Sequence, residues 1–202
     1  FIDILPTGRV GLMSVVFTPV GIRDILHLPL NELTNRYVSL EEALGKEGKD
    51  MEEQMMNLAG FDERVDSLET FLLGRLQRRN EFENNRMRMV MTRLLQGRGM
   101  FNVEQLAGYA CLSKKQFERV FAAYVGLMPK QYLRVIRFLY AVEFRNRMPE
   151  VDLATLAFHT GYYDAAHLAN EIKALTGHTS STLFQLMCFS EDAESIEWFL
   201  GA

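Results

Sequence analysis

The same pattern of two short helices joined by a turn occurs twice in this chain of 202 residues. In the first copy Ala107 stands ten residues before Phe117, and in the second copy Ala157 stands eleven residues before Leu168. Apolar residues at such positions mark the inner faces of short helices, and the second copy carries one extra residue at its turn. The repeat predicts a mainly helical fold with two helix-turn-helix subdomains.

Polar residues with strong capping preferences punctuate both copies. Asn102 and Ser113 precede the two helices of the first copy, which places the first motif at about residues 102–124. Asp152 and Asp164 take the corresponding positions in the second copy, and Gly161 makes its turn. The second motif is therefore expected at about 152–176.

One uninterrupted helical pattern separates the two motifs, and it predicts a linker helix over about residues 129–148. At a rise of 1.5 Å per residue, the stretch from Lys130 to Met148 spans about 28 Å, close to the roughly 34 Å turn of B-DNA. Two helices held apart by such a spacer suit two successive segments of a major groove on one face of DNA.

The net charge of −4 hides three regions of different sign. Residues 1–80 sum to −4, residues 81–150 hold 12 basic and 6 acidic side chains and sum to +6, and residues 151–202 sum to −6. A polyanion responds to the local field rather than to the total charge. The middle third is therefore the candidate surface for nucleic acid.

The second helix of the first motif carries the densest set of candidate contacts. Lys115 and Arg119 lie four residues apart on the side away from Phe117, with Lys114 and Glu118 beside them. Arginine donates two hydrogen bonds to guanine and glutamate accepts from cytosine, and each good pair discriminates by about 1–3 kcal/mol. A solvated helix face has the same pattern, so the two interpretations are equal on this feature alone.

Arginines also follow one stripe of the predicted linker helix. Arg134, Arg137 and Arg145 either contact phosphates near its ends or remain solvated.

Several spaced signatures together carry a resemblance. They are Leu106-Ala107, the run Leu112 to Phe121, Gly126-x-x-Pro129-x-x-Tyr132-Leu133-x-x-x-Arg137, and Leu156-Ala157-x-x-x-Gly161-Tyr162. With them, residues 83–185 resemble the DNA-binding domain of the AraC/XylS family of bacterial transcription regulators. The resemblance implies a cytoplasmic, sequence-specific regulator that binds double-stranded DNA, with RNA polymerase and a small-molecule effector as further partners. The residues expected to bind DNA are Ser113, Lys114, Lys115, Gln116, Glu118, Arg119, Arg134, Arg137, Ala165, Ala166 and Asn170.

The predicted domains are 1–80, 81–189 for DNA binding, and an acidic tail at 190–202. Residues 1–80 resemble, more weakly, part of a regulatory and dimerisation domain, through Phe17-Thr18-Pro19, Leu26-His27-Leu28-Pro29 and Leu40 to Gly45. Ile2 to Leu5 and Arg9 to Thr18 flank a turn-forming Pro-Thr-Gly, which predicts a short β-hairpin and makes this a small α+β segment.

A homodimer through residues 1–80 is expected. A helix over about residues 62–79 carries an apolar stripe, made of Val65, Leu68, Phe71, Leu72 and Leu76. The stripe pairs either with its copy in a second subunit or with strands of its own chain. The tail packs on the domain, or contacts a partner, or covers the basic half as an acidic flap.

The second motif departs from the family pattern. Family members generally place arginine where this chain has Asn170, and the outward face formed with Ala165, Ala166 and Ala169 carries no positive charge. Either Asn170 reads an adenine while the alanines contact thymine methyls, or this half only docks alongside DNA or on a partner. DNA contact is expected mainly from the first motif.

Catalysis and metal binding find no support in the sequence, and neither a cofactor nor a membrane partner is expected. The four histidines form no metal-binding spacing, and phosphate loops and nucleophile elbows are absent. Cys111 and Cys188 are expected to be reduced and partly buried. The competing hypothesis is a protein- or effector-binding module with a degenerate second motif and weak or no DNA binding.

Overall fold

The computed structural model describes residues 13–76 and 81–187, and every regular element in these ranges is a helix, which confirms the mainly helical class. The elements are α1 (Pro19–Leu26), the 3-10 helix η1 (Leu30–Glu32), α2 (Leu40–Leu44), α3 (Lys46–Asn57), α4 (Phe61–Arg75), α5 (Glu81–Gln96), α6 (Val103–Tyr109), α7 (Lys114–Val125), α8 (Pro129–Arg147), α9 (Leu153–His159), α10 (Ala165–Thr176) and α11 (Ser180–Met187).

The predicted β-hairpin is not supported. Its first strand and its turn lie outside the described residues, and residues 13–18, which belong to its second strand, form no strand. Val15 and Val16 are 44% and 70% exposed. A β-branched run shows that a segment fits a half-buried sheet, and no sheet is present among the described residues to receive it.

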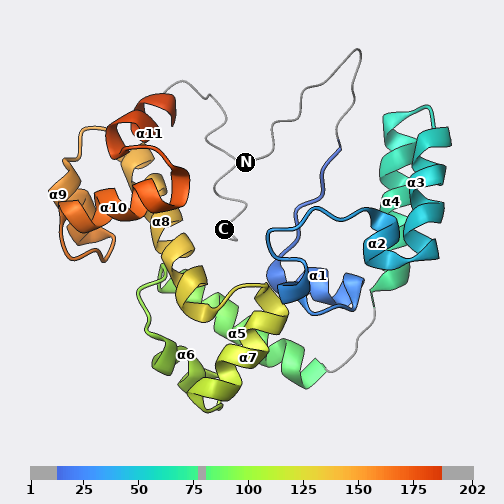
Figure 1. Cartoon of the computed structure of the whole chain (residues 1–202), viewed down its shortest axis with the longest axis horizontal. Coiled ribbons are helices and arrows are strands. Elements are labelled where there is room, and N and C mark those ends of the chain that lie inside the picture. Colours follow the sequence, from blue (N-terminus) through green and yellow to red (C-terminus); the bar gives the residue numbers. More distant parts are fainter. Residues whose placement is uncertain (1–12, 77–80, 188–202) are drawn as a thin grey trace.

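The helices form three groups (Figure 1). The helices α2, α3 and α4 stand at one end, α9, α10 and α11 stand at the other, and α5, α6 and α7 lie between them together with α1. The long helix α8 runs from the central group into the far one. We call α6 and α7 the first motif, and α9 and α10 the second motif.

The larger core lies in the central group. Met87, Val90, Met91 and Leu94 repeat at helical spacing along α5 and are at most 7% exposed. They pack with the inner residues of the first motif, with Leu133 and Ile136 of α8, and with Val20 of α1. Val20, which precedes the domain boundary predicted near residue 80, is therefore part of the core of the following domain.

A smaller core holds the second motif. Its buried members are Ala141, Leu156, Ala157, Tyr162, Leu168 and Ile172. Ala141 is the one fully buried member that α8 contributes, with Phe138 and Phe144 packed partly buried beside it. The ring of Phe144 also stacks on His159 of α9, with ring centroids 5.2 Å apart.

The predicted bounds of both motifs and of the linker helix agree with the observed helices to within a few residues. The helix predicted from residue 62 is α4, which begins at Phe61 and ends earlier than expected, at Arg75. Residues 77–80, at the end of that prediction, and the tail from 190 to 202 lie outside the described residues.

Candidate nucleic-acid interface

Side chains of the first motif cap both of its helices, as their residue types predict. The Asn102 Oδ1 accepts from the Gln105 backbone N–H at 2.8 Å, and the Gln105 side chain accepts from the Asn102 N–H at 2.9 Å. Ser113 and Gln116 make the same reciprocal pair at the start of α7. These bonds satisfy backbone donors that a helix start leaves open, and they fix the angle at which α7 begins.

Aspartates cap the second motif instead. Asp152 accepts from the N–H groups of Ala154 and Thr155, both at 2.9 Å, and Asp164 accepts from the His167 N–H at 2.7 Å. The backbone bond from Thr155, followed by the bond from its hydroxyl, lowers the pKa of Asp152. The second motif thus has charged caps where the first has neutral ones.

The two turns have the same geometry. The Leu112 N–H donates to the Ala107 carbonyl at 3.0 Å, and the Tyr162 N–H donates to the Ala157 carbonyl at 3.0 Å. Both turns contain a residue with positive φ, which is +52° at Cys111 and +75° at Gly161. The residue inserted in the second copy is therefore Tyr163, which follows the turn and is 91% exposed.

Cys111 corrects one expectation, because it is exposed rather than partly buried. It occupies the left-handed turn position, which faces solvent at the end of α6. Cys188 lies outside the described residues.

The helix α7 separates its two faces cleanly. Phe117, Phe121 and Tyr124 are at most 1% exposed and bind the helix to the core. Lys115 and Arg119 are exposed on the opposite side, one turn apart, and Glu118 is partly exposed. The predicted cations of this helix therefore share one accessible face.

Two other predicted residues of α7 already have partners. Lys114 donates to Glu104 of α6 at 2.6 Å, and this bond raises the pKa of Lys114 and lowers that of Glu104. The side chain of Gln116 is engaged with Ser113. Because Lys114 is 54% exposed, solvent screens its ion pair and water reaches its ammonium group.

The helix α10 offers a neutral face at the equivalent positions. Ala166 and Asn170 are exposed where the first motif has Lys115 and Arg119, and Ala165 is partly exposed. Lys173 is also exposed and lies on the same stripe, at i, i+4 and i+7 from Ala166. Lys173 is not among the residues expected to bind DNA, although its helical spacing from Ala166 and Asn170 places it on their face.

Arg134 and Arg137 of the linker helix were expected to be free to bind phosphate, but both contact the second motif. Arg134 donates from Nε and Nη2 to the two carboxylate oxygens of Glu171 in α10, at 2.8 and 3.0 Å. Their side chains are 34% and 17% exposed. The hydrogen bond to Glu171 raises the pKa of Arg134, which stays charged.

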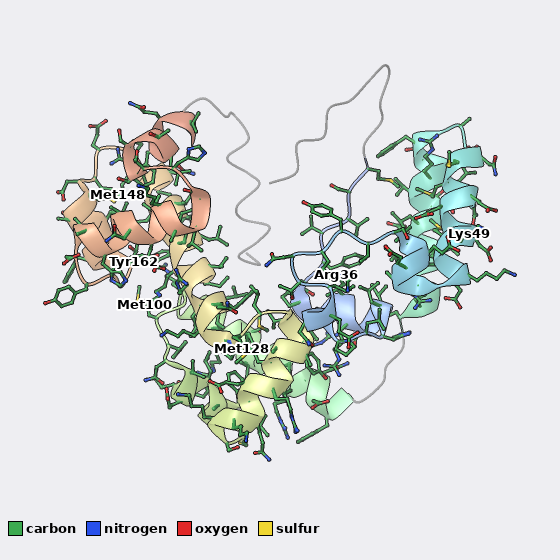
Figure 2. The ribbon with its side chains drawn as sticks, viewed as in Figure 1. Arg36, Lys49, Met100, Met128, Met148 and Tyr162 are labelled. Atoms are coloured by element: carbon green, nitrogen blue, oxygen red, sulfur yellow. The ribbon has the colours of Figure 1, made fainter. Side chains whose placement is uncertain are left out.

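Arg137 lies at the junction of the two motifs. Its guanidinium carbon is 5.7 Å from the ring centroid of Tyr162, and its Nε is buried without a hydrogen-bond partner in the described residues. Burial raises the pKa of Tyr162 to about 12, although the positive charge of Arg137 acts in the opposite direction. Figure 2 shows Tyr162 here with Met100, whose side chain would lie 3.2 Å from a Cβ placed on Gly161.

The N-terminal segment docks on the end of α7. The Tyr124 hydroxyl donates to Asn84 Oδ1 at 2.7 Å, and the Asn84 side chain donates to Asp24 of α1 at 2.7 Å. The Arg23 guanidinium stacks 3.9 Å over the Tyr124 ring. The Thr34 hydroxyl, just after η1, donates to the carbonyl of Gly126, which ends α7.

Two features are absent from residues 13–76 and 81–187, a cluster of metal-ligand side chains and a helix that could span a bilayer. These residues contain no group of three or more His, Cys, Asp and Glu side chains placed to hold a metal ion. None of their helices combines the length and the apolar character that crossing a bilayer requires.

Comparison with known families agrees with this geometry. Residues 106–185 match a family model described as a helix-turn-helix domain. Residues 106–185 form an AraC-type helix-turn-helix domain. This helix-turn-helix domain begins within α6, includes all of α8 and the second motif, and ends within α11.

A relative from Haemophilus influenzae extends the comparison beyond the helix-turn-helix domain. It is named an uncharacterized HTH-type transcriptional regulator and is 26% identical to this chain over 136 residues. The match covers 61% of this chain and 45% of that protein, so it spans less than half the length of the relative. No solved structure matches the chain.

Proposed function

We propose that this chain is a sequence-specific DNA-binding transcription regulator of the AraC type, and that α7 makes most of its contacts with the major groove. The helix-turn-helix domain supports the class of function. The observation that carries the proposal is the accessible pair of Lys115 and Arg119, on a capped helix whose opposite side is fixed in the core. Such a helix presents a phosphate-binding lysine and a base-reading arginine without reorganisation.

Ser113, Lys114, Gln116 and Glu118 complete the proposed DNA contacts of the first motif. A contact of Arg134 or Arg137 with phosphate requires the side chain to leave its place beside Glu171 or Tyr162. We therefore assign phosphate binding in this proposal to the exposed lysines before the arginines of α8. Contacts of Ala165, Ala166 and Asn170 with DNA are assigned a smaller share, because phosphate contacts supply most non-specific affinity and this face has few cations.

Selection of duplexes from a random pool tests the proposal directly. At moderate salt, the full chain should enrich one sequence class, and the affinity should fall as salt rises. Lys115→Ala should weaken binding to every duplex by a similar factor, since an ammonium on phosphate carries no sequence information.

A matched control removes one positive charge elsewhere. Lys49 is exposed on α3, in the group farthest from the second motif (Figure 2), and Lys49→Ala should leave DNA binding unchanged. Absence of any enriched sequence with a folded protein would contradict the proposal.

One observation favours the competing function, a module that binds another protein through the second motif. Phe158 and Tyr163 are 81% and 91% exposed beside the neutral face of α10. Exposed aromatic rings are more frequent at protein interfaces than on other surfaces. Under this alternative, Phe158→Ser should abolish binding of a protein partner, and salt-dependent binding to duplex DNA should be absent.

We further propose that residues 1–80 form the homodimer interface of the regulator and house its response to an effector, with RNA polymerase as a partner on the promoter. No residue of α4 is buried within the chain, and Phe61 and Leu73 are 64% and 68% exposed. Sedimentation equilibrium should give a dimer that Leu73→Asp weakens. A monomer at all concentrations would contradict the dimer.

A further inference from the structure

The second motif carries polar groups at two positions where the first motif packs apolar side chains. In the first motif Leu112 and Val120 are partly buried against the larger core. The equivalent residues in the second motif are Tyr162 and Glu171. The equivalence follows from the shared turn bonds and from the fully buried pair Leu168 and Ile172, which match Phe117 and Phe121.

Both polar groups face an arginine of α8. Glu171 receives two hydrogen bonds from Arg134, and the Tyr162 ring lies against the Arg137 guanidinium. A two-point contact between a planar guanidinium and a carboxylate fixes orientation as well as distance, which a single bond does not. The second motif is therefore held to α8 at its turn and in the middle of α10.

Apolar and ring contacts also join α8 to the second motif, and among them Phe144 stacks on His159 of α9 with ring centroids 5.2 Å apart. Ala141 is the single fully buried residue that α8 adds to the smaller core. By contrast, Leu133 and Ile136 of α8 lie deep in the larger core, and each is adjacent in sequence to one of the two arginines. The first motif is thus joined to α8 by packing, whereas α10 is joined to α8 by the two-point ion pair of Arg134 with Glu171, in addition to the stacking of Phe144 on His159 of α9.

We propose that the Arg134–Glu171 ion pair is a positioning contact that sets the separation of the two DNA segments this chain recognises. This inference rests on the proposed DNA binding. With the pair formed, α7 and α10 hold one relative orientation, and the DNA must present its two half-sites at one spacing. With the pair broken, α10 keeps its apolar contacts with α8 but loses the two-point contact that fixes its orientation, and it accommodates other spacings.

The test uses the duplex enriched in selection and two derivatives, with one base pair inserted or deleted between the half-sites. One added base pair moves the second half-site by about 3.4 Å and rotates it by about 35°. Wild-type protein should lose about tenfold in affinity on each derivative, the loss expected for about one good contact. Glu171→Gln should shrink this spacing penalty to about threefold or less.

The ratio of the affinity for the selected duplex to the affinity for each derivative separates the effect of geometry from the effect of charge. Glu171→Gln removes a negative charge and so raises affinity for all three duplexes by a similar factor, which leaves the ratio unaffected. Exchange of the pair, Arg134→Glu with Glu171→Arg, should restore the tenfold penalty. Glu143→Gln is the matched control, because Glu143 pairs with Arg147 one turn later within α8; it should keep the wild-type penalty.

The outcomes are decisive in both directions. A full penalty in Glu171→Gln, no penalty in the wild-type protein, or no restoration in the folded exchange variant each overturns the inference. These results differ from the failure of the proposed function, in which no duplex is enriched at all. Circular dichroism confirms that each variant is folded before its affinity is measured.

Discussion

In the first motif α7 turns Lys115 and Arg119 to solvent, whereas in the second motif α10 turns Ala166 and Asn170 to solvent at the equivalent positions. The buried positions barely differ: Leu106 and Leu156, which stand fifty residues apart, are 0% and 1% exposed. Packing tolerates few changes inside a motif, while an exposed position is free to change its charge. Conservation of the buried residues between the two motifs therefore does not prove that their exposed faces share a function.

Truncation of matched core residues should have the largest effects on stability, because both motifs depend on the packing of equivalent buried side chains. Phe117→Ala should lower the free energy of unfolding by about 3–5 kcal/mol, and Leu168→Ala by about 2–5 kcal/mol. Denaturant unfolding followed by circular dichroism measures both. Met89→Ala, at an exposed position of α5, should change the free energy of unfolding by no more than about 0.5 kcal/mol. Similar, small changes in the free energy of unfolding for all three variants would mean that the buried residues do not stabilise the two motifs.

The next largest effect should separate the two exposed faces. Arg119→Ala should weaken binding to the selected duplex by about 1–3 kcal/mol, whereas Asn170→Ala should weaken it by less than about 1 kcal/mol, because the second motif makes the smaller share of the contacts. Fluorescence anisotropy at fixed salt measures the two dissociation constants. The reverse pattern would move the main DNA contact to the second motif.

Restoring cations to the second motif should sharpen the comparison by a smaller amount. In the double variant Ala166→Lys with Asn170→Arg, each new phosphate contact should make the slope of log K against log salt steeper by about 0.9. The matched control places the same two charges on α3, as Gln54→Lys with Met56→Arg, at exposed positions. An equal change of slope in both variants would show that total charge, rather than the place of α10 on DNA, is responsible.

The smallest effect should come from the caps. Hydrogen bonds from Thr155 lower the pKa of Asp152 in the folded protein, so its contribution to stability is present above the unfolded pKa of about 3.9 and is lost as pH falls through the folded pKa. Asn102, the cap of the first motif, does not titrate. The stability of Asp152→Asn should consequently fall less between about pH 5 and pH 2 than that of the wild type. Parallel curves for the two proteins would contradict this assignment.

Local signals explain why the helix-turn-helix frame could be predicted from the sequence. Asn102 and Ser113 cap the helices that follow them within three residues, and the apolar spacing around Phe117 identifies the inner face of α7. Both kinds of signal depend on neighbours in the chain. The cap and the stripe therefore carry the prediction without knowledge of the tertiary fold.

Signals that depend on a distant partner were misread or missed. Residues 13–18 have the composition of a strand, but a strand needs a neighbouring strand, and the described residues provide none. The stripe of arginines on α8 gave no indication that Arg134 faces Glu171, thirty-seven residues later. Whether both arginines also meet phosphate remains a prediction, since it depends on DNA that is bound.

The contact of the N-terminal segment with α7 has a consequence for folding during synthesis on the ribosome. Thr34 and Gly126 are 92 residues apart in sequence, and Val20 enters a core made of residues that follow it by more than sixty positions. At about 5–20 residues per second, the ribosome needs roughly 5 to 20 seconds to deliver this partner. During that interval the nascent chain exposes the apolar side of α1, and the first motif completes its folding only when the earlier segment returns to it.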